Sequence, residues 1–207
     1  PLAEVVAIAR RRAIPVLVDA AAQIPPIANL WRFTGELGAD AVIFSGGKGL
    51  RGPQSTGLIL GRRNLIEACR ANGSPNHAIG RPMKVGKEEL AGILAAVEWS
   101  VAQDEPATLT AYEETVNGWL AGLGGISGVV VERGFPSEAG QPHSRAIIRL
   151  LPNARLSRDA LTTALWELNP RIAVGAVGTD AIALNPQTLQ PGEAVLVMAA
   201  IRQALAR

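Results

Sequence analysis

The sequence is poor in the residues that build metal sites and disulfide frameworks. Its 207 residues include one cysteine, Cys69, and two histidines, His77 and His143. A single cysteine excludes an internal disulfide, and so few cysteines and histidines argue against a Cys/His metal centre. We therefore expect no bound metal. Cys69 lies in a helix-like apolar run, where we expect a buried structural thiol.

Long hydrophobic runs and a strong charge of either sign are also missing. No stretch approaches the roughly 20 consecutive apolar residues that a membrane-spanning helix needs, and no signal-peptide pattern is present. The formal net charge is only +2, and the arginines are scattered, so nothing indicates a nucleic-acid surface. These absences, with the low cysteine content, predict a cytoplasmic protein without a membrane partner.

The sequence does contain enough apolar residues for a core. It is 48% hydrophobic and 18% charged, at a length that suits one large domain or two modest ones. Up to residue 101, helices alternate with short apolar strands, which is typical of α/β folds. Asp104-Glu105-Pro106 then ends the most regular helix. We predict one domain at 1–104 and a small α+β domain at 105–207, with two helices on an antiparallel sheet.

The first domain contains the pattern that bears on function. Val16-Leu17-Val18 is a continuous apolar run that predicts a strand buried on both faces of a parallel sheet, and it ends at Asp19. The next strand, 41–44, leads into Ser45-Gly46-Gly47-Lys48. Ligands of open α/β sheets collect at the carboxyl ends of the strands. Asp19 and Lys48 should share that edge.

Two interpretations of this pair remain open from the spacing alone. A lysine in a glycine loop is usually a solvated charge, and a strand-end aspartate is usually a turn or cap residue. Together they match what pyridoxal phosphate requires. Lys48 would form a Schiff base with the aldehyde, and Asp19 would hold a proton on the pyridine nitrogen. A Walker phosphate loop is excluded, because Gly-x-x-x-x-Gly-Lys-Ser/Thr is absent.

Several short segments together carry a resemblance to a known family. They are Val-Asp-Ala-Ala-Ala-Gln at 18–23, Gly-Ala-Asp at 38–40, Phe-Ser-Gly-Gly-Lys at 44–48 and Gly-Pro-Gln-Ser-Thr-Gly at 52–57. With them the chain resembles the fold-type I pyridoxal phosphate enzymes. The match is to the family that contains L-seryl-tRNA(Sec) selenium transferase and D-glucosaminate-6-phosphate ammonia-lyase. Segments 80–88 and 185–193 resemble later signatures, so the resemblance covers nearly the whole chain.

The resemblance implies the architecture. The fold is expected to be α/β, with 1–104 the C-terminal part of an aspartate aminotransferase-like, cofactor-binding large domain and 105–207 the small α+β domain. Because the chain opens at Pro1 inside a helix-like run, we expect a C-terminal fragment. Its phosphate-binding and ring-stacking residues would lie in a preceding part. Such a fragment is expected to bind the cofactor weakly and to be inactive alone, and the intact protein to be a homodimer or larger homo-oligomer.

The resemblance also implies roles for individual residues. Lys48 matches the Schiff-base lysine and Asp19 the partner of the pyridine nitrogen. Ala21 matches the small residue that lies against the ring. Ser45 resembles the hydroxyl that contacts the cofactor phosphate, with a plain strand-end turn serine as the alternative.

The remaining polar candidates are less specific. Arg81 and Lys84 fall where the family presents cations to an anionic substrate, and the alternative is a pair of solvated loop charges. Arg51 and Gln54 could line the site, but nothing in the sequence selects them. The two histidines are expected to be loop residues rather than acids or bases.

The implied reaction is α-deprotonation with β-elimination, of the ammonia-lyase type, on a small anionic amino acid or amino sugar acid. The alternatives are a selenium transferase-like reaction, an aminotransferase-type activity, or a binding protein that kept the fold. Gly47 precedes Lys48 where the selenium transferases carry an acidic residue, which favours the lyase. The chain has no basic, aromatic-bearing extension for tRNA, although a tRNA partner stays open.

Overall fold

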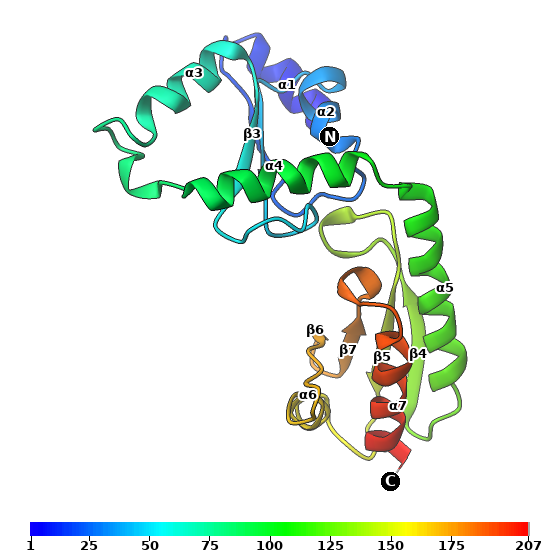
Figure 1. Cartoon of the computed structure of the whole chain (residues 1–207). Helices are drawn as coiled ribbons and strands as arrows, with labels where there is room; N and C mark the ends of the chain where they lie inside the picture. Colours follow the sequence, from blue (N-terminus) through cyan, green and yellow to red (C-terminus); the bar gives the residue numbers. More distant parts are fainter. Residues whose placement is uncertain (207) are drawn as a thin grey trace. The chain divides into compact units, whose positions relative to one another are not determined.

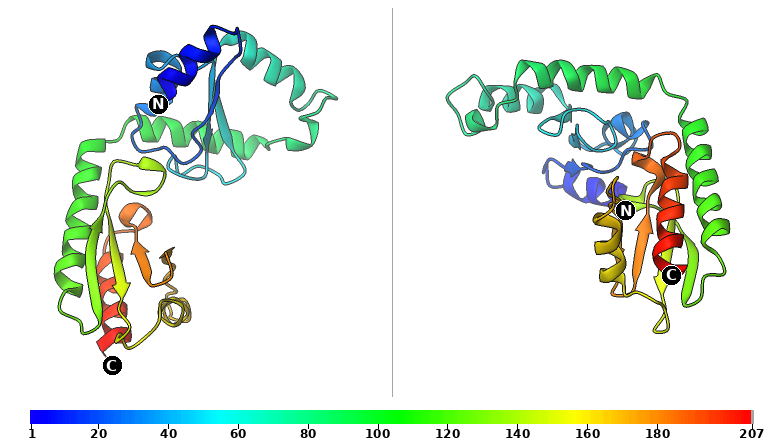
Figure 2. Two further views of the ribbon diagram at one scale, coloured as in Figure 1. Left: turned by 180° about the vertical axis from the view of Figure 1, so that it is seen from behind. Right: turned by 60° about the horizontal axis from the view of Figure 1, so that its bottom comes forward.

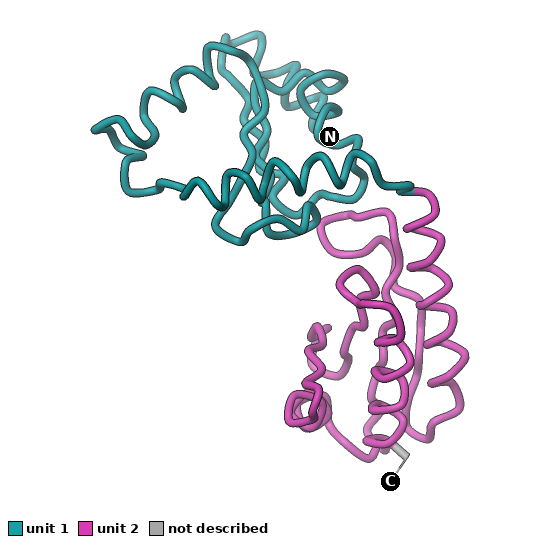
Figure 3. Tube along the Cα trace, in the orientation of Figure 1, with its two compact units in different colours: residues 1–105 teal, residues 106–207 magenta. Residues whose placement is uncertain are grey.

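The computed structural model describes residues 1–206, which form two compact units (Figure 3). The first unit is Pro1–Glu105 and the second is Pro106–Arg207. In the described range, no helix combines the length and the apolar character that crossing a membrane requires.

A three-stranded sheet forms the centre of the first unit (Figure 1). Its strands are β1 (Leu17–Asp19), β2 (Ala41–Ser45) and β3 (Gly57–Gly61), in the order β1-β2-β3. β1 is parallel to β2, and β3 is antiparallel to β2. The helical elements are α1 (Leu2–Arg10), α2 (Asn29–Trp31), the π-helical turn η1 (Arg32–Glu36), α3 (Arg63–Asn72), the 3₁₀ turn η2 (Arg81–Met83) and α4 (Lys87–Val101).

One face of this sheet carries the core of the unit. Alternate strand residues share a face, and Val42 and Phe44 of β2 pack with Phe33 of η1 and Ile93 of α4. The opposite face is open, and Leu17 is 56% exposed. The prediction that the strand before Asp19 is buried on both faces is therefore wrong. More than half of Leu17 is exposed, and β1 is an edge strand of the sheet in the described chain.

Two helices of the first unit are also more exposed than their periodicity predicts. α4 carries apolar residues at helical spacing along 90–101, but only Ile93 among them is buried, and Leu94 is 61% exposed. α3 buries none of its residues, so Cys69 is exposed. The prediction of a buried structural thiol is wrong, because periodicity identifies an apolar face without showing whether another element packs on it.

The second unit is a four-stranded antiparallel sheet with three helices (Figures 1 and 2). The strand order is β4-β5-β7-β6, formed by β4 (Val129–Gly134), β5 (Arg145–Leu150), β6 (Gly175–Val177) and β7 (Ala181–Leu184). The helical elements are α5 (Glu105–Leu123), the turn η3 (Glu138–Gly140), α6 (Arg158–Trp166), the turn η4 (Pro186–Thr188) and α7 (Glu193–Ala206). The predicted antiparallel sheet is therefore present in this unit.

All three helices contribute to one core, where the sequence predicted two. Val116 of α5, Leu161 of α6 and Ile201 of α7 are fully buried against Ile148 of β5. The Trp119 indole nitrogen donates a hydrogen bond of 2.9 Å to the carbonyl of Ala194, which fixes α5 to the start of α7. These helices cover one face of the sheet, and the alternate residues Ile147, Ala181 and Ala183 form a second, smaller buried cluster.

Candidate active site at the carboxyl edge of the first sheet

The parallel pairing of β1 and β2 brings three predicted site residues to one edge. Asp19 ends β1 opposite Ile43, and Ser45 ends β2 two residues later. The pairing continues past β1, because the Ser45 amide donates to the Ala21 carbonyl at 3.3 Å. Asp19, Ala21 and Ser45 thus lie around the same end of the two strands, as the sequence predicts for their strand positions.

The Asp19 carboxylate serves the turn and keeps an oxygen available. Its Oδ1 accepts a hydrogen bond of 3.0 Å from the Ala21 amide, the usual local bond of a turn aspartate. The side chain is exposed, and Oδ2 has no partner among residues 1–206. The turn role and a ligand role are therefore compatible in this carboxylate.

Lys48 lies in a tightly closed loop directly after β2. The Gly46 amide donates to the Thr56 carbonyl at 2.9 Å, and the Gly52 amide donates back to the Gly46 carbonyl at 2.7 Å. The Gln54 side-chain amide donates to the Gly47 carbonyl at 3.0 Å. Within the described chain the exposed Lys48 amine forms no hydrogen bond or ion pair, so the loop holds the backbone and leaves the amine available.

The glycines of this loop are required by close packing. A Cβ on Gly46 would lie 1.9 Å from the Thr56 hydroxyl oxygen, and one on Gly49 would lie 2.1 Å from the Ile24 carbonyl oxygen. Neither glycine has a positive φ. The left-handed residue of the loop is Arg51, with φ of 59°. The small residues therefore bring the backbone of the Lys48 loop against its neighbours.

Sequence reasoning did not select three residues that shape this loop. Arg51 carries the left-handed backbone, Gln54 bonds to Gly47, and the buried Thr56 donates from Oγ1 to the Pro53 carbonyl at 2.6 Å. The Gly52-Pro53 turn signal pointed to the segment, but not to its individual contacts.

The structure does not bring Arg81 and Lys84 into contact with Lys48. Arg81 belongs to η2, and its guanidinium donates to the Ser74 hydroxyl at 3.5 Å within the same connection. Lys84 follows η2 and is exposed. In residues 1–206, no hydrogen bond or ion pair joins either cation to Asp19 or Lys48. Their predicted role toward an anionic substrate stays a prediction.

The second unit contains a separate polar network around Glu113. Arg133 donates to both carboxylate oxygens, and the Ser144 hydroxyl donates to Oε2 at 2.5 Å. The hydrogen bond from Arg133, and after it that from Ser144, lower the pKa of the Glu113 carboxyl below its usual range. His143 is a loop residue as expected but only 2% exposed, and burial lowers the pKa of its imidazole. His77 is an exposed loop residue.

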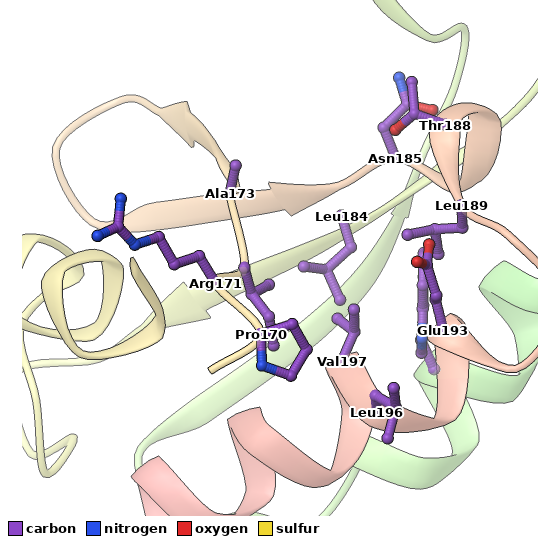
Figure 4. Close-up of a pocket in the computed structure, with 12 residues that line it drawn as sticks. Pro170, Arg171, Ala173, Leu184, Asn185, Thr188, Leu189, Glu193, Leu196 and Val197 are labelled. Carbon is purple, nitrogen blue, oxygen red and sulfur yellow. The ribbon is translucent and has the colours of Figure 1, made fainter. Parts of the chain in front are cut away.

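The second unit also has an apolar cavity of about 260 Å³ (Figure 4). Its walls include Leu184, Leu189 and Val197, while Arg171 and Glu193 supply charged groups. None of the predicted cofactor or substrate residues lines it. The carboxylate, hydroxyl and amine of the predicted cofactor-binding residues lie instead at the carboxyl edge of the first sheet.

Known proteins resemble the part of the chain that carries this candidate site. The class-V aminotransferase family model matches residues 1–79, which include β1, β2 and the Lys48 loop. A D-glucosaminate-6-phosphate ammonia-lyase of known structure aligns with all of this chain and 54% of its own, at a TM-score of 0.70 and 26% identity. The chain therefore shares the fold of the fold-type I pyridoxal phosphate enzymes and resembles them in sequence.

Relatives of known activity within these enzymes differ in reaction. The chain is 36% identical to a 5'-C-glycyluridine monooxygenase-decarboxylase of Streptomyces, over 90% of this chain and 46% of the relative. It is 29% identical to D-glucosaminate-6-phosphate ammonia lyase of Salmonella typhimurium, over 96% and 51%. It is 30% identical to L-seryl-tRNA(Sec) selenium transferase of Nitratidesulfovibrio vulgaris, over 99% and 48%. The chain spans about half the length of these relatives.

The comparisons confirm the predicted resemblance to these enzymes and the α/β fold, and they point to pyridoxal 5'-phosphate as the cofactor. The residues at the sheet edge suit that molecule chemically. Lys48 offers a primary amine for an aldehyde, Asp19 a carboxylate oxygen for a pyridinium proton, and Ser45 a hydroxyl for a phosphate. The closely packed loop around Lys48 leaves its side chain exposed.

Proposed function

We propose that the protein is a pyridoxal phosphate-dependent enzyme that removes the α-proton of an amino acid or amino sugar acid and eliminates its β-substituent. The observation that carries this proposal is the position of Asp19 and Lys48 after two neighbouring parallel strands. Similarity to an ammonia lyase along almost the whole chain supports the lyase outcome.

Each residue at the edge has a role that its chemistry allows. When bound, the cofactor supplies an electron sink for the α-carbon of the substrate. The Lys48 amine is the attachment point for the aldehyde, and the Asp19 carboxylate holds the proton on the pyridine nitrogen. Ser45 would donate its hydroxyl hydrogen to the cofactor phosphate, and Ala21 would be the small residue beside the ring.

Lys48 also moves the proton that starts the reaction. Its Nζ, once free, accepts the α-proton as a general base and can return it as a general acid. The β-hydroxyl of the substrate leaves with a proton as water, and one water is consumed when ammonia is released. The products are a 2-keto acid and ammonia, so the reaction needs no external oxidant or reductant.

The substrate class follows from chemistry that the relatives share. Their names contain a glycyl, a glucosaminate and a seryl unit, and each of these is an α-amino acid group. We assign Arg81 and Lys84 to the anionic part of such a substrate, because a guanidinium and an ammonium are suited to carboxylate and phosphate groups. The enzyme would act in the cytoplasm as a homodimer or larger homo-oligomer.

Three other reactions of an amino acid substrate are alternatives to the elimination. A selenium transferase-like reaction would replace the β-substituent with a nucleophile. The 30% identity to such an enzyme supports this alternative. The 36% identity to a monooxygenase-decarboxylase favours a reaction in which the α-carboxylate is lost. An aminotransferase-type activity is the fourth possibility in this fold.

The test of the cofactor assignment is covalent trapping. The purified protein is mixed with pyridoxal phosphate, reduced with borohydride, digested and mapped by mass spectrometry. We expect the label on Lys48 in preference to the exposed Lys84 and Lys87. Lys48→Ala should abolish the selective label and the absorbance band of the bound cofactor, and Lys87→Ala should change neither. Equal labelling of all three lysines would rule out the assignment.

The test of the reaction is product analysis. Serine-like substrates and phosphorylated amino sugar acids are incubated with the cofactor-loaded full-length protein, and ammonia, 2-keto acid and carbon dioxide are measured. Equal amounts of ammonia and 2-keto acid support the elimination. Carbon dioxide without 2-keto acid would replace it with decarboxylation, and no product from any of these substrates would discard the lyase proposal.

A further inference from the structure

Arg51 is unusual for a residue with a side chain, because its φ is 59°. Side chains other than glycine rarely adopt this left-handed conformation, because the Cβ crowds the backbone. The loop already contains Gly46, Gly47, Gly49 and Gly52, yet an arginine occupies the left-handed position. A strained residue in a site loop persists only when its surroundings hold it in place.

The left-handed turn at Arg51 closes the loop on Lys48 itself. The Arg51 amide donates a hydrogen bond of 2.9 Å to the Lys48 carbonyl. The next amide, that of Gly52, donates to the Gly46 carbonyl at 2.7 Å. Two backbone hydrogen bonds therefore close this loop, an outer one between Gly52 and Gly46 and an inner one between Arg51 and Lys48.

The side chain of Arg51 fastens this turn to α4. Its guanidinium carbon lies 5.6 Å from the centre of the Trp99 ring, within the range of a cation–π contact. The residue before it, Leu50, is 1% exposed in the core, and its carbonyl accepts a hydrogen bond of 3.5 Å from the Ser100 hydroxyl. Trp99 and Ser100 both belong to α4.

We propose that Arg51 is a positioning residue for Lys48. Stacking on Trp99 holds the left-handed backbone, and this backbone fixes the carbonyl and hence the amine of Lys48 at the carboxyl edge of β1 and β2. Glycine would reach the same φ without strain but would leave the loop free to move. The inference rests on the proposed role of Lys48 as the attachment point of the cofactor.

The experiment uses the same borohydride trapping, with the full chain and pyridoxal phosphate as the probe. Arg51→Ala and Trp99→Leu should each lower the selectivity for Lys48 over Lys84 and Lys87 by about tenfold, since small misplacements of a reacting group are costly. Both should also shift the pH at which the absorbance of the bound cofactor changes. The conservative Trp99→Phe should retain most of the selectivity, because it keeps an aromatic face.

Controls separate this inference from folding and from the proposed function. Trp99 is partly exposed, so Trp99→Leu should keep the circular dichroism and the unfolding midpoint close to those of the parent. If Lys48 is not selectively labelled in the parent protein, the proposed function fails. If the parent is labelled selectively and both variants behave like it, the positioning role of Arg51 is overturned while the proposed function stands.

Discussion

The two units differ in how completely they cover their sheets. In the second unit, three helices pack on one face of four strands, and every residue of β7 is buried. In the first unit, the strands β1 and β3 alternate between exposed and half-buried residues, and α3 buries nothing. The candidate chemistry lies in the unit with the more open sheet. The more completely buried sheet and the candidate active site thus belong to different units of the chain.

The largest expected effect compares a buried position of the second sheet with an exposed position of the first. Ile148 of β5 is 0% exposed, and Ile43 of β2 is 37% exposed. Ile148→Ala should lower the free energy of unfolding of its unit by about 2–5 kcal/mol, because it removes buried methyl groups and leaves a cavity. Ile43→Ala should cost about 1 kcal/mol or less.

The measurement is urea unfolding combined with amide hydrogen exchange, read separately for β5 with β7 and for β2 with β3. Protection should fall in the second unit for Ile148→Ala and stay near the parent value in the first. Equal losses in both units for either substitution would show that the sheets do not differ in this way.

A smaller effect concerns the stability of the second unit at acidic pH. Burial lowers the pKa of His143 below its ordinary value of about 6.5, so the unfolded chain takes up the proton first. The stabilising contribution of neutral His143 is therefore complete above about pH 6.5 and is lost as the pH falls toward the folded-state pKa. We expect the second unit to lose stability as the pH falls through the range in which the unfolded imidazole takes up its proton.

His143→Gln should flatten that slope, and unfolding midpoints at several pH values measure it. Glu113, whose pKa is also lowered, acts in a separate window. Its contribution is complete above its unfolded pKa and is lost only below about pH 4.5. An unchanged slope in His143→Gln would contradict the assignment to His143.

The smallest effect concerns the thiol on α3. Because Cys69 is exposed, a thiol reagent should react with about one equivalent in the native protein without denaturant. Cys69→Ser should change the free energy of unfolding by no more than about 0.5 kcal/mol. In that background, Ala146→Cys places a thiol at a fully buried position of β5, and it should react only after unfolding. Protection of Cys69 in the native state would contradict the open surface of α3.

The sequence predicted the types of the elements and the positions of the candidate site residues better than it predicted which side chains are buried. Apolar runs ending at Asp19 and Ser45 identified two strands, and their parallel pairing follows from the helix between them. The exposure of Leu17 and Cys69 could not be predicted, because an apolar pattern specifies a face and not its neighbour. The left-handed Arg51 was equally hidden, since a glycine is the residue that normally marks such a position.

The edge position of β1 has a consequence for handling the protein at high concentration. Its outer backbone groups face away from β2, and Leu17 adds an exposed apolar side chain, the combination that favours intermolecular strand pairing. Three consecutive arginines, Arg10 to Arg12, precede this strand. Like charges beside an apolar strand act as gatekeepers against aggregation. We expect these arginines to oppose self-association at the strand that carries the candidate aspartate, because like charges on two copies repel each other.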